Sequence, residues 1–380
     1  MVPFDFQLRT RIVFGQGTFG RLGQLARDLR FERALLVTGA RVAQAGHVTE
    51  ALRLLNLAGV AAIPFEHPGP YTDTAMIEIA RQFAEPLRVD SIVGLGGGTS
   101  LDYARAINLA LANDKSIGDI RGHHRGDTPL LPMIGVPTTA GAGSEAQSSA
   151  TIVDAVTRTS TVCGDPSAAM RVALLDPELT LTAPRHVTAM AGFDAVAHAV
   201  ETAVTVRRTP LSDTFSHTAW RLLGDALERV LLHPADVEAR AAMLLGSHYA
   251  GMAIEQSMLG AAHACASPLT TRYSLPHGLA LAMLLPHVVR WNASVALERY
   301  AALLNSPRRR ARDEDAAETF ARRLEDLAGA AGLAMKLSDT GVTGTDLPEL
   351  AAEAARQWTG TFNPRPFDAV AAREIYRAAL

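Results

Sequence analysis

The sequence predicts an α/β domain over residues 1–183 and an all-helical domain over residues 184–380. Up to about Asp176, short apolar segments alternate with amphipathic helical patterns, which is typical of parallel strands joined by crossover helices. After Pro184, strand signals nearly vanish and long alanine- and leucine-rich windows of helical period take over. The chain's 380 residues also exceed the roughly 100–200 residues usual for one domain.

The α/β part contains four candidate strands with helical patterns between them. The strands are expected at Ala34–Thr38, Ala61–Phe65, Ser91–Gly94 and Leu131–Val136, and the helices at Val48–Ala58, Thr74–Phe83 and Leu101–Ala112. This order predicts a doubly wound sheet with a nucleotide site at the carboxyl ends of its strands. Two turn signals, Leu174–Glu178 and Ala183–Pro184, mark the domain boundary.

The second part is a succession of amphipathic windows. Helices are expected at Thr188–Val204, Asp213–Leu232, Val237–Gly251, Leu279–Val289, Ser294–Leu304, Ala316–Ala331 and Leu347–Gln357. Because no strand pattern interrupts them, we expect this domain to be all-helical.

The composition excludes several classes of function. With 36 Lys and Arg against 39 Asp and Glu, the chain lacks the basic surface that nucleic acids or anionic membranes require. Two cysteines, Cys163 and Cys265, cannot form a disulfide framework or a cysteine-rich zinc site. The lysines, Lys115 and Lys336, lie outside any glycine-rich loop, which argues against a Walker loop and against Schiff-base chemistry.

The N-terminal residues and the apolar segments predict the setting of the protein. Residues 1–11 show no basic region followed by an apolar run, so no secretory signal is expected. No apolar stretch approaches the roughly 20 residues that a membrane-spanning helix needs. We therefore expect a cytoplasmic protein whose partners are small molecules and neither nucleic acid nor membrane. A homodimer is expected as well.

A glycine-rich turn joins the third predicted strand to the next helix. Gly96, Gly97 and Gly98 allow close backbone approach to a ligand, and Thr99 or Ser100 is expected to cap the helix that contains Asp102. Free amides and the helix dipole attract a phosphate there. The spacing is not Gly-x-Gly-x-x-Gly, because Thr99 replaces the last glycine. Taken alone, the turn is equally consistent with a tight connection of no function.

Two further segments belong to the same predicted sheet edge. The loop after the fourth strand offers the hydroxyls of Thr138, Thr139 and Ser144. At the end of the first strand, Gly39 stands where an acidic residue would bind the ribose 2′-hydroxyl and repel a 2′-phosphate. Arg41 can pair with that phosphate, so both NAD(H) and NADP(H) are permitted; otherwise Arg41 simply faces solvent.

One aspartate and three histidines form a candidate metal site. Asp194 and His198 are four residues apart, hence on one helix face. With His263 and His277 they would suit Fe²⁺ or Zn²⁺ and leave a position for water or substrate. Taken one at a time, these residues could equally form a surface ion pair or be histidines buried in the core. We assign the remaining histidines to such positions, without a role in metal binding.

Together these segments resemble the iron-containing, or group III, alcohol dehydrogenases. The segments that carry the resemblance span the chain: Arg11–Gly17, Gly96–Asp102, Pro137–Glu145, Asp176–Thr180, Asp194–His198, Leu259–His263, Pro276–Gly278 and Asn363–Arg365. The resemblance implies a dehydroquinate synthase-like fold, with the active site in the cleft between a dinucleotide domain and a helical metal domain.

The resemblance also implies a role for each residue. The family's metal ligands fall on Asp194, His198, His263 and His277. Its pyrophosphate loop falls on Gly96, Gly97, Gly98, Thr99 and Ser100, and its nicotinamide-side loop on Thr138, Thr139 and Ser144. The divalent metal then acts as a Lewis acid on a carbonyl or alkoxide while hydride moves to or from the nicotinamide.

The chain departs from the family pattern at several positions. Ser267 stands where most members carry a second histidine, a candidate proton relay, and a serine has no useful pKa near neutrality. The pattern over Leu269–Gly278, including Thr270, is similar to members that reduce small anionic aldehydes such as phosphonoacetaldehyde. Arg272 or Arg158 could serve such an anion, although either suits a surface position equally.

Alternative functions follow from the same resemblance. Maleylacetate reductase-like members usually lack the full ligand set found here. A dehydroquinate synthase-like lyase needs several lysines, whereas this chain has two. A non-enzymatic cofactor-binding protein with a decayed site is favoured only by Ser267. The sequence therefore predicts an NAD(P)-dependent alcohol dehydrogenase or aldehyde reductase.

Overall fold

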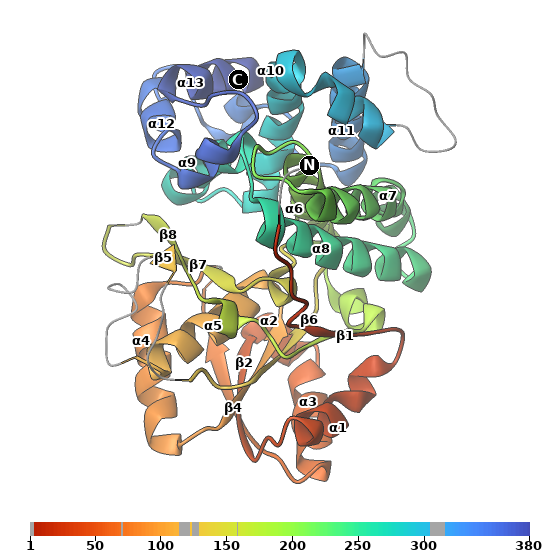
Figure 1. Cartoon of the computed structure of the whole chain (residues 1–380), viewed down its shortest axis with the longest axis vertical. Helices are drawn as coiled ribbons and strands as arrows, with labels where there is room; N and C mark the ends of the chain where they lie inside the picture. The colour runs from red at the N-terminus through yellow and green to blue at the C-terminus, as the bar shows by residue number, and fades with distance from the viewer. Residues whose placement is uncertain (1–3, 70, 114–121, 124–128, 158, 305–315) are drawn as a thin grey trace. The chain divides into compact units, whose positions relative to one another are not determined.

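A six-stranded parallel sheet forms the centre of the first unit of the chain, Phe6–Ala183 (Figure 1). The computed structural model describes residues 4–69, 71–113, 122–123, 129–157, 159–304 and 316–380. The strand order is β1-β9-β6-β4-β2-β3. The strands are β1 (Arg11–Phe14), β2 (Arg33–Gly39), β3 (Ala61–His67), β4 (Ser91–Gly96), β6 (Met133–Pro137) and β9 (Val172–Leu175).

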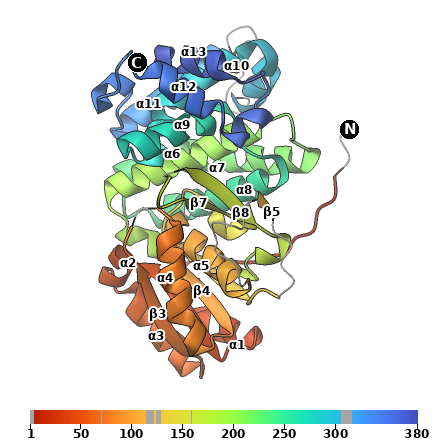
Figure 2. The ribbon, with the colours of Figure 1, turned by 90° about the vertical axis from the view of Figure 1, so that its left-hand side faces the viewer.

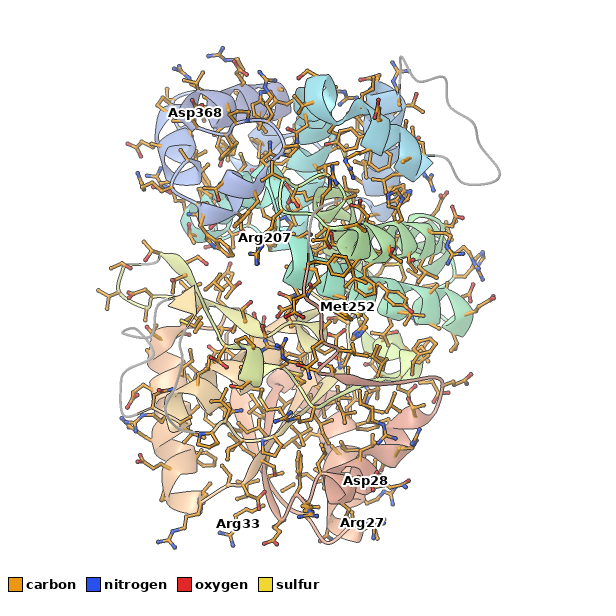
Figure 3. All side chains as sticks on the ribbon, viewed as in Figure 1. Arg27, Asp28, Arg33, Arg207, Met252 and Asp368 are labelled. Atoms are coloured by element: carbon orange, nitrogen blue, oxygen red, sulfur yellow. The ribbon has the colours of Figure 1, made fainter. Side chains whose placement is uncertain are left out.

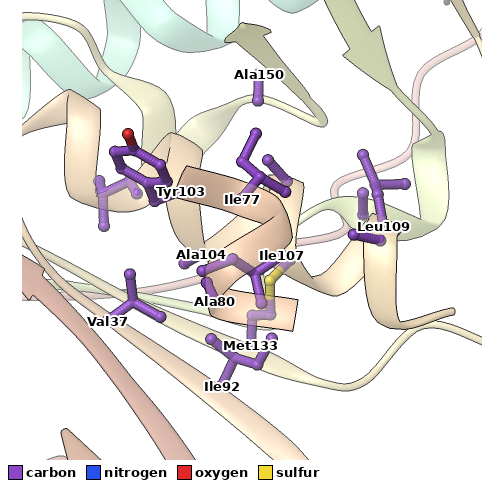
Figure 4. Packing of buried hydrophobic residues seen from close by; sticks show 14 of the residues in the cluster. Val37, Ile77, Ala80, Ile92, Tyr103, Ala104, Ile107, Leu109, Met133 and Ala150 are labelled. Carbon is purple, nitrogen blue, oxygen red and sulfur yellow. The ribbon is translucent and has the colours of Figure 1, made fainter. Parts of the chain in front are cut away.

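Helices cover both faces of this sheet. They are α1 (Leu22–Asp28), α2 (Ala40–Gln44), α3 (His47–Leu57), α4 (Thr74–Ala84) and α5 (Gly98–Leu111). Successive residues of a strand point to opposite faces, so Leu35 and Val37 pack with α4 and α5 while Leu36 packs with α1 and α3. Figure 2 shows α4 and α5 on their side of the strands, and Figure 4 shows Ile77 and Ile107 in that cluster. Burial on both faces explains the nearly continuous apolar runs of the central strands.

The four predicted strands are present, but the sequence analysis missed two more. β1 and β9 pair along their lengths, from Arg11 with Val172 to Phe14 with Leu175. Each has only four residues, and β1 lies at the sheet edge, where alternating exposure weakens the apolar signal. Leu174 and Leu175, assigned to a turn, are therefore the end of a buried strand.

A second, three-stranded sheet was also not predicted. It has the order β5-β8-β7 and consists of β5 (Gly122–His123), β7 (Ser149–Val153) and β8 (Ser160–Gly164). β7 and β8 form an antiparallel pair in which Ala150 lies opposite Cys163. Both residues belong to the core on the α5 side of the main sheet.

The second unit contains Pro184–Leu380 together with the chain's first residues up to Asp5. Its helices are α6 (Arg185–Thr202), α7 (Pro210–Leu232), α8 (Val237–Ser257), α9 (Ala261–Tyr273), α10 (His277–Leu304), α11 (Ala316–Ala331), α12 (Leu347–Ala354) and α13 (Ala369–Ala379). Side-chain hydrogen bonds to backbone amides determine where several of these helices begin. Thr209 and Ser212 form a capping box before α7, and Asp368, labelled in Figure 3, accepts the Ala371 amide before α13.

Helix α10 joins two segments that the sequence analysis predicted as separate helices. Between them lie Arg290 and Asn292, polar residues that looked like an interruption. In the structure Arg290 binds Glu318 and Glu325, and Asn292 exchanges hydrogen bonds with Asn363. Because partners within the unit satisfy these polar groups, the helix continues through them.

The length of α10 bears on the expectation that no segment crosses a membrane. Among the described residues, it is the one helix long and apolar enough to cross a membrane, with a mean hydropathy of 1.2 over its best window. That window is 61% buried inside the fold. Since a membrane-spanning helix would need those faces for lipid, we assign α10 to the core of its unit.

Candidate metal centre and cofactor loops

Three helices of the second unit bring an aspartate and histidines together. Asp194 and His198 lie one turn apart on α6, His263 lies in the first turn of α9, and His277 is the first residue of α10. One ligand atom each from Asp194, His263 and His277 lies within 4.8 Å of the others. Carboxylate oxygen and imidazole nitrogen atoms at such spacing can surround a single divalent ion.

The buried atoms of this cluster fit a cation. Asp194 Oδ1 and His263 Nε2 are buried and have no hydrogen-bond partner among the described residues, although they lie 3.8 Å apart. Buried polar atoms normally have partners, because leaving them without one costs about 1–3 kcal/mol. Both atoms belong to the three residues whose ligand atoms lie within 4.8 Å of one another, so a metal bound there would supply the missing partner.

His198 lies beside this group without belonging to the compact set of three. Its Nε2 is 3.3 Å from Asp194 Oδ1. Its ring stacks on that of His263 with centroids 4.8 Å apart. All four predicted ligands are therefore neighbours, and the tightest cluster contains three of them.

The charges of the cluster favour an ion at its centre. Burial alone would raise the pKa of Asp194, but His198 and the other two histidines outweigh it and hold that pKa well below the usual range. Burial alone would lower the pKa of His263, whereas Glu201 and Asp194 raise it to about 9. Burial lowers the pKa of His277 to about 4. Without metal, a proton on His263 balances the carboxylates, and a divalent ion would take over that role.

Glu201 is a site residue that the sequence analysis did not assign. It lies one turn after His198 on α6, and its carboxylate accepts the Nδ1 proton of His263 at 2.5 Å and the Ala262 amide at 2.7 Å. Its side chain is 3% exposed. Holding the proton on Nδ1 leaves Nε2 of His263 as the lone-pair donor that faces the cluster. The spacing of 194, 198 and 201 on one helix face was the available signal.

Glu201→Gln is expected to weaken metal binding by about tenfold to a hundredfold, the usual effect of losing a carboxylate behind a histidine ligand. The glutamine keeps the shape of the side chain but loses the charge that holds the His263 tautomer. Competition titration with a chromophoric chelator measures the affinity. Glu298→Gln, an exposed position on α10, is the control, and an affinity equal to that of the parent protein would contradict this role for Glu201.

In the first unit, the glycine-rich turn forms the end of β4 and the start of α5. Gly96 has φ +151, which favours glycine, and α5 begins at Gly98 rather than at Leu101. Its N-cap is Gly97, and no side chain caps the helix. The expectation that Thr99 or Ser100 caps it is therefore wrong: both lie inside the first turn, because glycines already supply the required backbone. An uncapped helix start suits a phosphate ligand.

The loop after β6 lies directly against this turn. The Thr138 amide donates to the Gly96 carbonyl at 2.9 Å. A Cβ added at Gly98 would lie 2.6 Å from Ala142 Cβ, and one added at Gly97 would lie 3.0 Å from Thr139 Oγ1. The two predicted cofactor loops are thus adjacent, and glycine is needed where they touch.

Arg105 holds the second loop to α5 and was not predicted. Its fully buried guanidinium donates to the carbonyls of Ser144, Gln147 and Ser149 at 2.6–2.9 Å and lies 3.3 Å from Asp102. Burial raises the pKa of Asp102 to about 6, against the opposing effects of Arg105 and the Ser144 hydroxyl. This network fixes Ser144 and Asp102 in relation to the glycine turn.

The remaining predicted residues occupy ordinary positions. Gly39 ends β2, and Arg41 is exposed on α2. Ser267 is half-buried on α9, one turn after His263. Arg272 forms ion pairs with Glu349 at 2.5 Å and Glu353 at 3.7 Å, so carboxylates already balance its charge. Arg158 lies outside the described residues.

Comparisons with known proteins agree with the motifs along the whole chain. Residues 9–177 match the model of the iron-containing alcohol dehydrogenase family, and residues 188–380 match the model of the C-terminal part of the same family. The chain is 32% identical to the probable alcohol dehydrogenase EutG of Escherichia coli K12, over 96% of this chain and 92% of that protein. It is 30% identical to the 1,3-propanediol dehydrogenase of Citrobacter freundii, over 99% of both chains.

A solved structure shows the same fold. The crystal structure of a 1,3-propanediol oxidoreductase superimposes with a TM-score of 0.95 at 29% identity and covers 100% of both chains. Because the match covers the full length, it includes both units of the chain. A parallel-sheet unit followed by a helical unit is therefore the architecture that these proteins share.

Proposed function

Because the chain belongs to the iron-containing alcohol dehydrogenase family, we propose that it transfers hydride between a nicotinamide dinucleotide and a small alcohol or aldehyde. The observation that carries this proposal is the cluster of Asp194, His263 and His277, with ligand atoms within 4.8 Å of one another. Two buried polar atoms of this cluster, Asp194 Oδ1 and His263 Nε2, have no hydrogen-bond partner among the described residues. A bound metal would give them one, whereas a site that had lost its function would have no reason to keep them unpaired.

Asp194, His198, His263 and His277 are the proposed ligands of Fe²⁺ or Zn²⁺. When bound, such an ion polarises a carbonyl oxygen. Glu201 holds the proton of His263 on Nδ1, so that the lone pair of Nε2 is directed into the cluster. Asp194 supplies one negative charge, which leaves a divalent ion with net positive charge toward the substrate.

The glycine turn is the proposed seat of the dinucleotide's pyrophosphate. The uncapped start of α5 directs backbone amides toward a phosphate, and Gly97 and Gly98 allow the loop with Thr139 and Ala142 to pack directly against it. Arg105 keeps the Ser144 loop in contact with α5. These contacts support binding of the cofactor at the carboxyl ends of β4 and β6, where doubly wound sheets bind nucleotides.

Short, uncharged substrates are the proposed class. Proteins similar to this chain are named for 1,3-propanediol, for methanol, at 33% identity over 78% of each chain, and for lactaldehyde, at 29% identity. Each of these molecules has at most three carbons. An anionic substrate such as phosphonoacetaldehyde would need a free cation, and Arg272 is already paired with Glu349 and Glu353.

Ser267 is the proposed position for proton transfer, because it lies one turn from His263 on the same face of α9. Its hydroxyl can relay a proton through water but cannot store one near neutral pH. Ser267→His is expected to introduce a titration near pH 6.5 into the kcat profile, since histidine ionises there. Ser267→Ala should add no such titration. Identical pH profiles for all three proteins would contradict the relay.

Metal reconstitution with a substrate panel tests the proposed function. Protein stripped with a chelator and reloaded with Fe²⁺ or Zn²⁺ is assayed with NADH and NADPH against aldehydes of one to eight carbons and against phosphonoacetaldehyde. We expect metal-dependent reduction of short neutral aldehydes. Absence of activity with every aldehyde, in protein that binds both metal and dinucleotide, would overturn the proposal and favour a lyase or a non-catalytic role.

A further inference from the structure

His67 lies at the carboxyl end of β3, directly beside Gly39. The two residues are partners in the register of β2 and β3, and each is the last residue of its strand. His67 is 7% exposed. The end of β2 is where a dinucleotide's adenosine ribose lies in doubly wound folds, and an acidic side chain there selects a free 2′-hydroxyl.

The imidazole of His67 occupies the space that a side chain at position 39 would need. A Cβ added at Gly39 would lie 3.2 Å from both Cε1 and Nε2 of His67 and 3.8 Å from Ser100 Oγ. A side chain at position 39 would therefore require the ring to shift by a few tenths of an ångström. The end of β2 thus has no side chain of its own, and the imidazole from the end of β3 lies beside it.

The ring is fixed in this position by three contacts. Its Nδ1 donates to the Gly69 carbonyl at 3.2 Å, which places the proton of the neutral ring on Nδ1. Its Nε2 then accepts from the Ser100 hydroxyl at 2.8 Å. The ring also stacks on Tyr103 with centroids 4.7 Å apart. A protonated ring could keep the same contacts, because the Ser100 oxygen is also an acceptor.

The surrounding charges favour an anion. Arg41, two residues after Gly39, is exposed on α2 and forms no ion pair with any described residue. Glu66 is exposed but points to the opposite face of β3 from His67, because neighbouring strand residues alternate. Asp73 is engaged by Tyr103, whose hydroxyl lies 3.1 Å from its carboxylate. The helix that follows Gly39 therefore carries a guanidinium that has no ion-pair partner among the described residues.

We infer that His67 is a specificity-determining residue for the dinucleotide, and that with Arg41 it makes the end of β2 accept a ribose 2′-phosphate. The imidazole replaces the carboxylate that would repel this phosphate, and it keeps position 39 clear. The inference rests on the proposed function, since it requires a dinucleotide at this sheet edge. It predicts NADP(H) as the preferred cofactor.

Calorimetric titration of the full-length protein tests the inference without turnover. The ligands are NADP⁺ and NAD⁺, together with 2′,5′-ADP and 5′-AMP, which differ only in the 2′-phosphate. Wild-type protein should bind the 2′-phosphorylated member of each pair more tightly. His67→Glu and Gly39→Asp, which each place a carboxylate at this edge, should each lower affinity for that member by about tenfold to a hundredfold, with a much smaller effect on the other member.

Two further variants test whether His67 determines cofactor specificity or only holds the Ser100 side chain in place. His67→Gln can still hydrogen-bond Ser100 but lacks the ring, so it should lose discrimination while it keeps affinity for NAD⁺. His233→Leu changes an exposed histidine directly after α7 in the other unit, and this variant should bind all four ligands as the wild type does. Thermal melting confirms that each variant is folded.

The outcomes distinguish the inference from the proposed function. Equal losses for NAD⁺ and NADP⁺ in the His67 variants, or a wild-type preference for NAD⁺, would overturn the inference while dinucleotide binding stands. Failure of the wild type to bind either dinucleotide would overturn the cofactor site itself, and the inference with it.

Discussion

His277→Ala is expected to lower metal-dependent turnover by about a thousandfold, because loss of a ligand removes the several kcal/mol that a bound ion contributes to the transition state. His277 is half-buried at the start of α10 and belongs to the cluster with Asp194 and His263. Metal content per chain, measured by mass spectrometry of the purified protein, should fall in parallel with the rate.

The choice of His277 separates metal loss from misfolding. Truncating His263 would leave the buried Glu201 carboxylate without its partner, and breaking a buried pair costs about 3–5 kcal/mol of stability. Among the described residues, no carboxylate forms a hydrogen bond with His277, whose ring contacts Thr270, so its variant should melt close to the parent's temperature. His186→Ala, an exposed histidine on α6, is the control. Unchanged metal content and rate in His277→Ala would contradict the ligand assignment.

Gly98→Ala is expected to weaken dinucleotide binding by about tenfold to a hundredfold. The added methyl group would lie 2.6 Å from Ala142 Cβ, a distance that real Cβ contacts do not show. Relief requires the start of α5 and the loop containing Ala142 to separate, and overpacking of this kind costs about 1–3 kcal/mol. Fluorescence quenching by NADPH measures the dissociation constant.

The effect of Gly98→Ala should be confined to the cofactor. The metal ligands belong to the other unit, so metal content should equal that of the parent protein. Gly20→Ala adds a methyl group to the same unit where no atom lies within 4 Å, and it should leave dinucleotide affinity unchanged. If both alanine variants bind NADPH as the parent does, the glycine turn is not the phosphate seat.

The metal cluster shows which parts of a site are predictable from sequence. Asp194 and His198 are separated by one helical turn, so their proximity follows from spacing alone. Glu201 shares their helix face, but its role depends on His263, which is 62 residues away. Spacing can place such a carboxylate on the helix face of the ligands, but the histidine that it orients is determined only when α6 and α9 pack together.

The α/β unit shows a similar limit. The central strands were predictable because burial on both faces makes them continuously apolar, whereas the short edge strand β1 alternates and was missed. Arg105 resembles a surface residue in the sequence, yet its buried side chain donates to the backbone carbonyls of Ser144, Gln147, Ser149 and Ala168. The pairing of Gly39 with His67 depends on the register between β2 and β3. This register is fixed when the apolar faces of all the strands are buried together, so it cannot be predicted from either strand alone.

Isotope transfer tests the central claim most directly. The metal-loaded protein is incubated with NADPH or NADH that carries two deuterium atoms at nicotinamide C4 and with a short aldehyde, and the alcohol is analysed by mass spectrometry. Direct hydride transfer places one deuterium on the former carbonyl carbon, and chelator-treated protein should form almost no labelled alcohol. Unlabelled alcohol, or equal labelling with and without metal, would contradict metal-dependent hydride transfer by this protein.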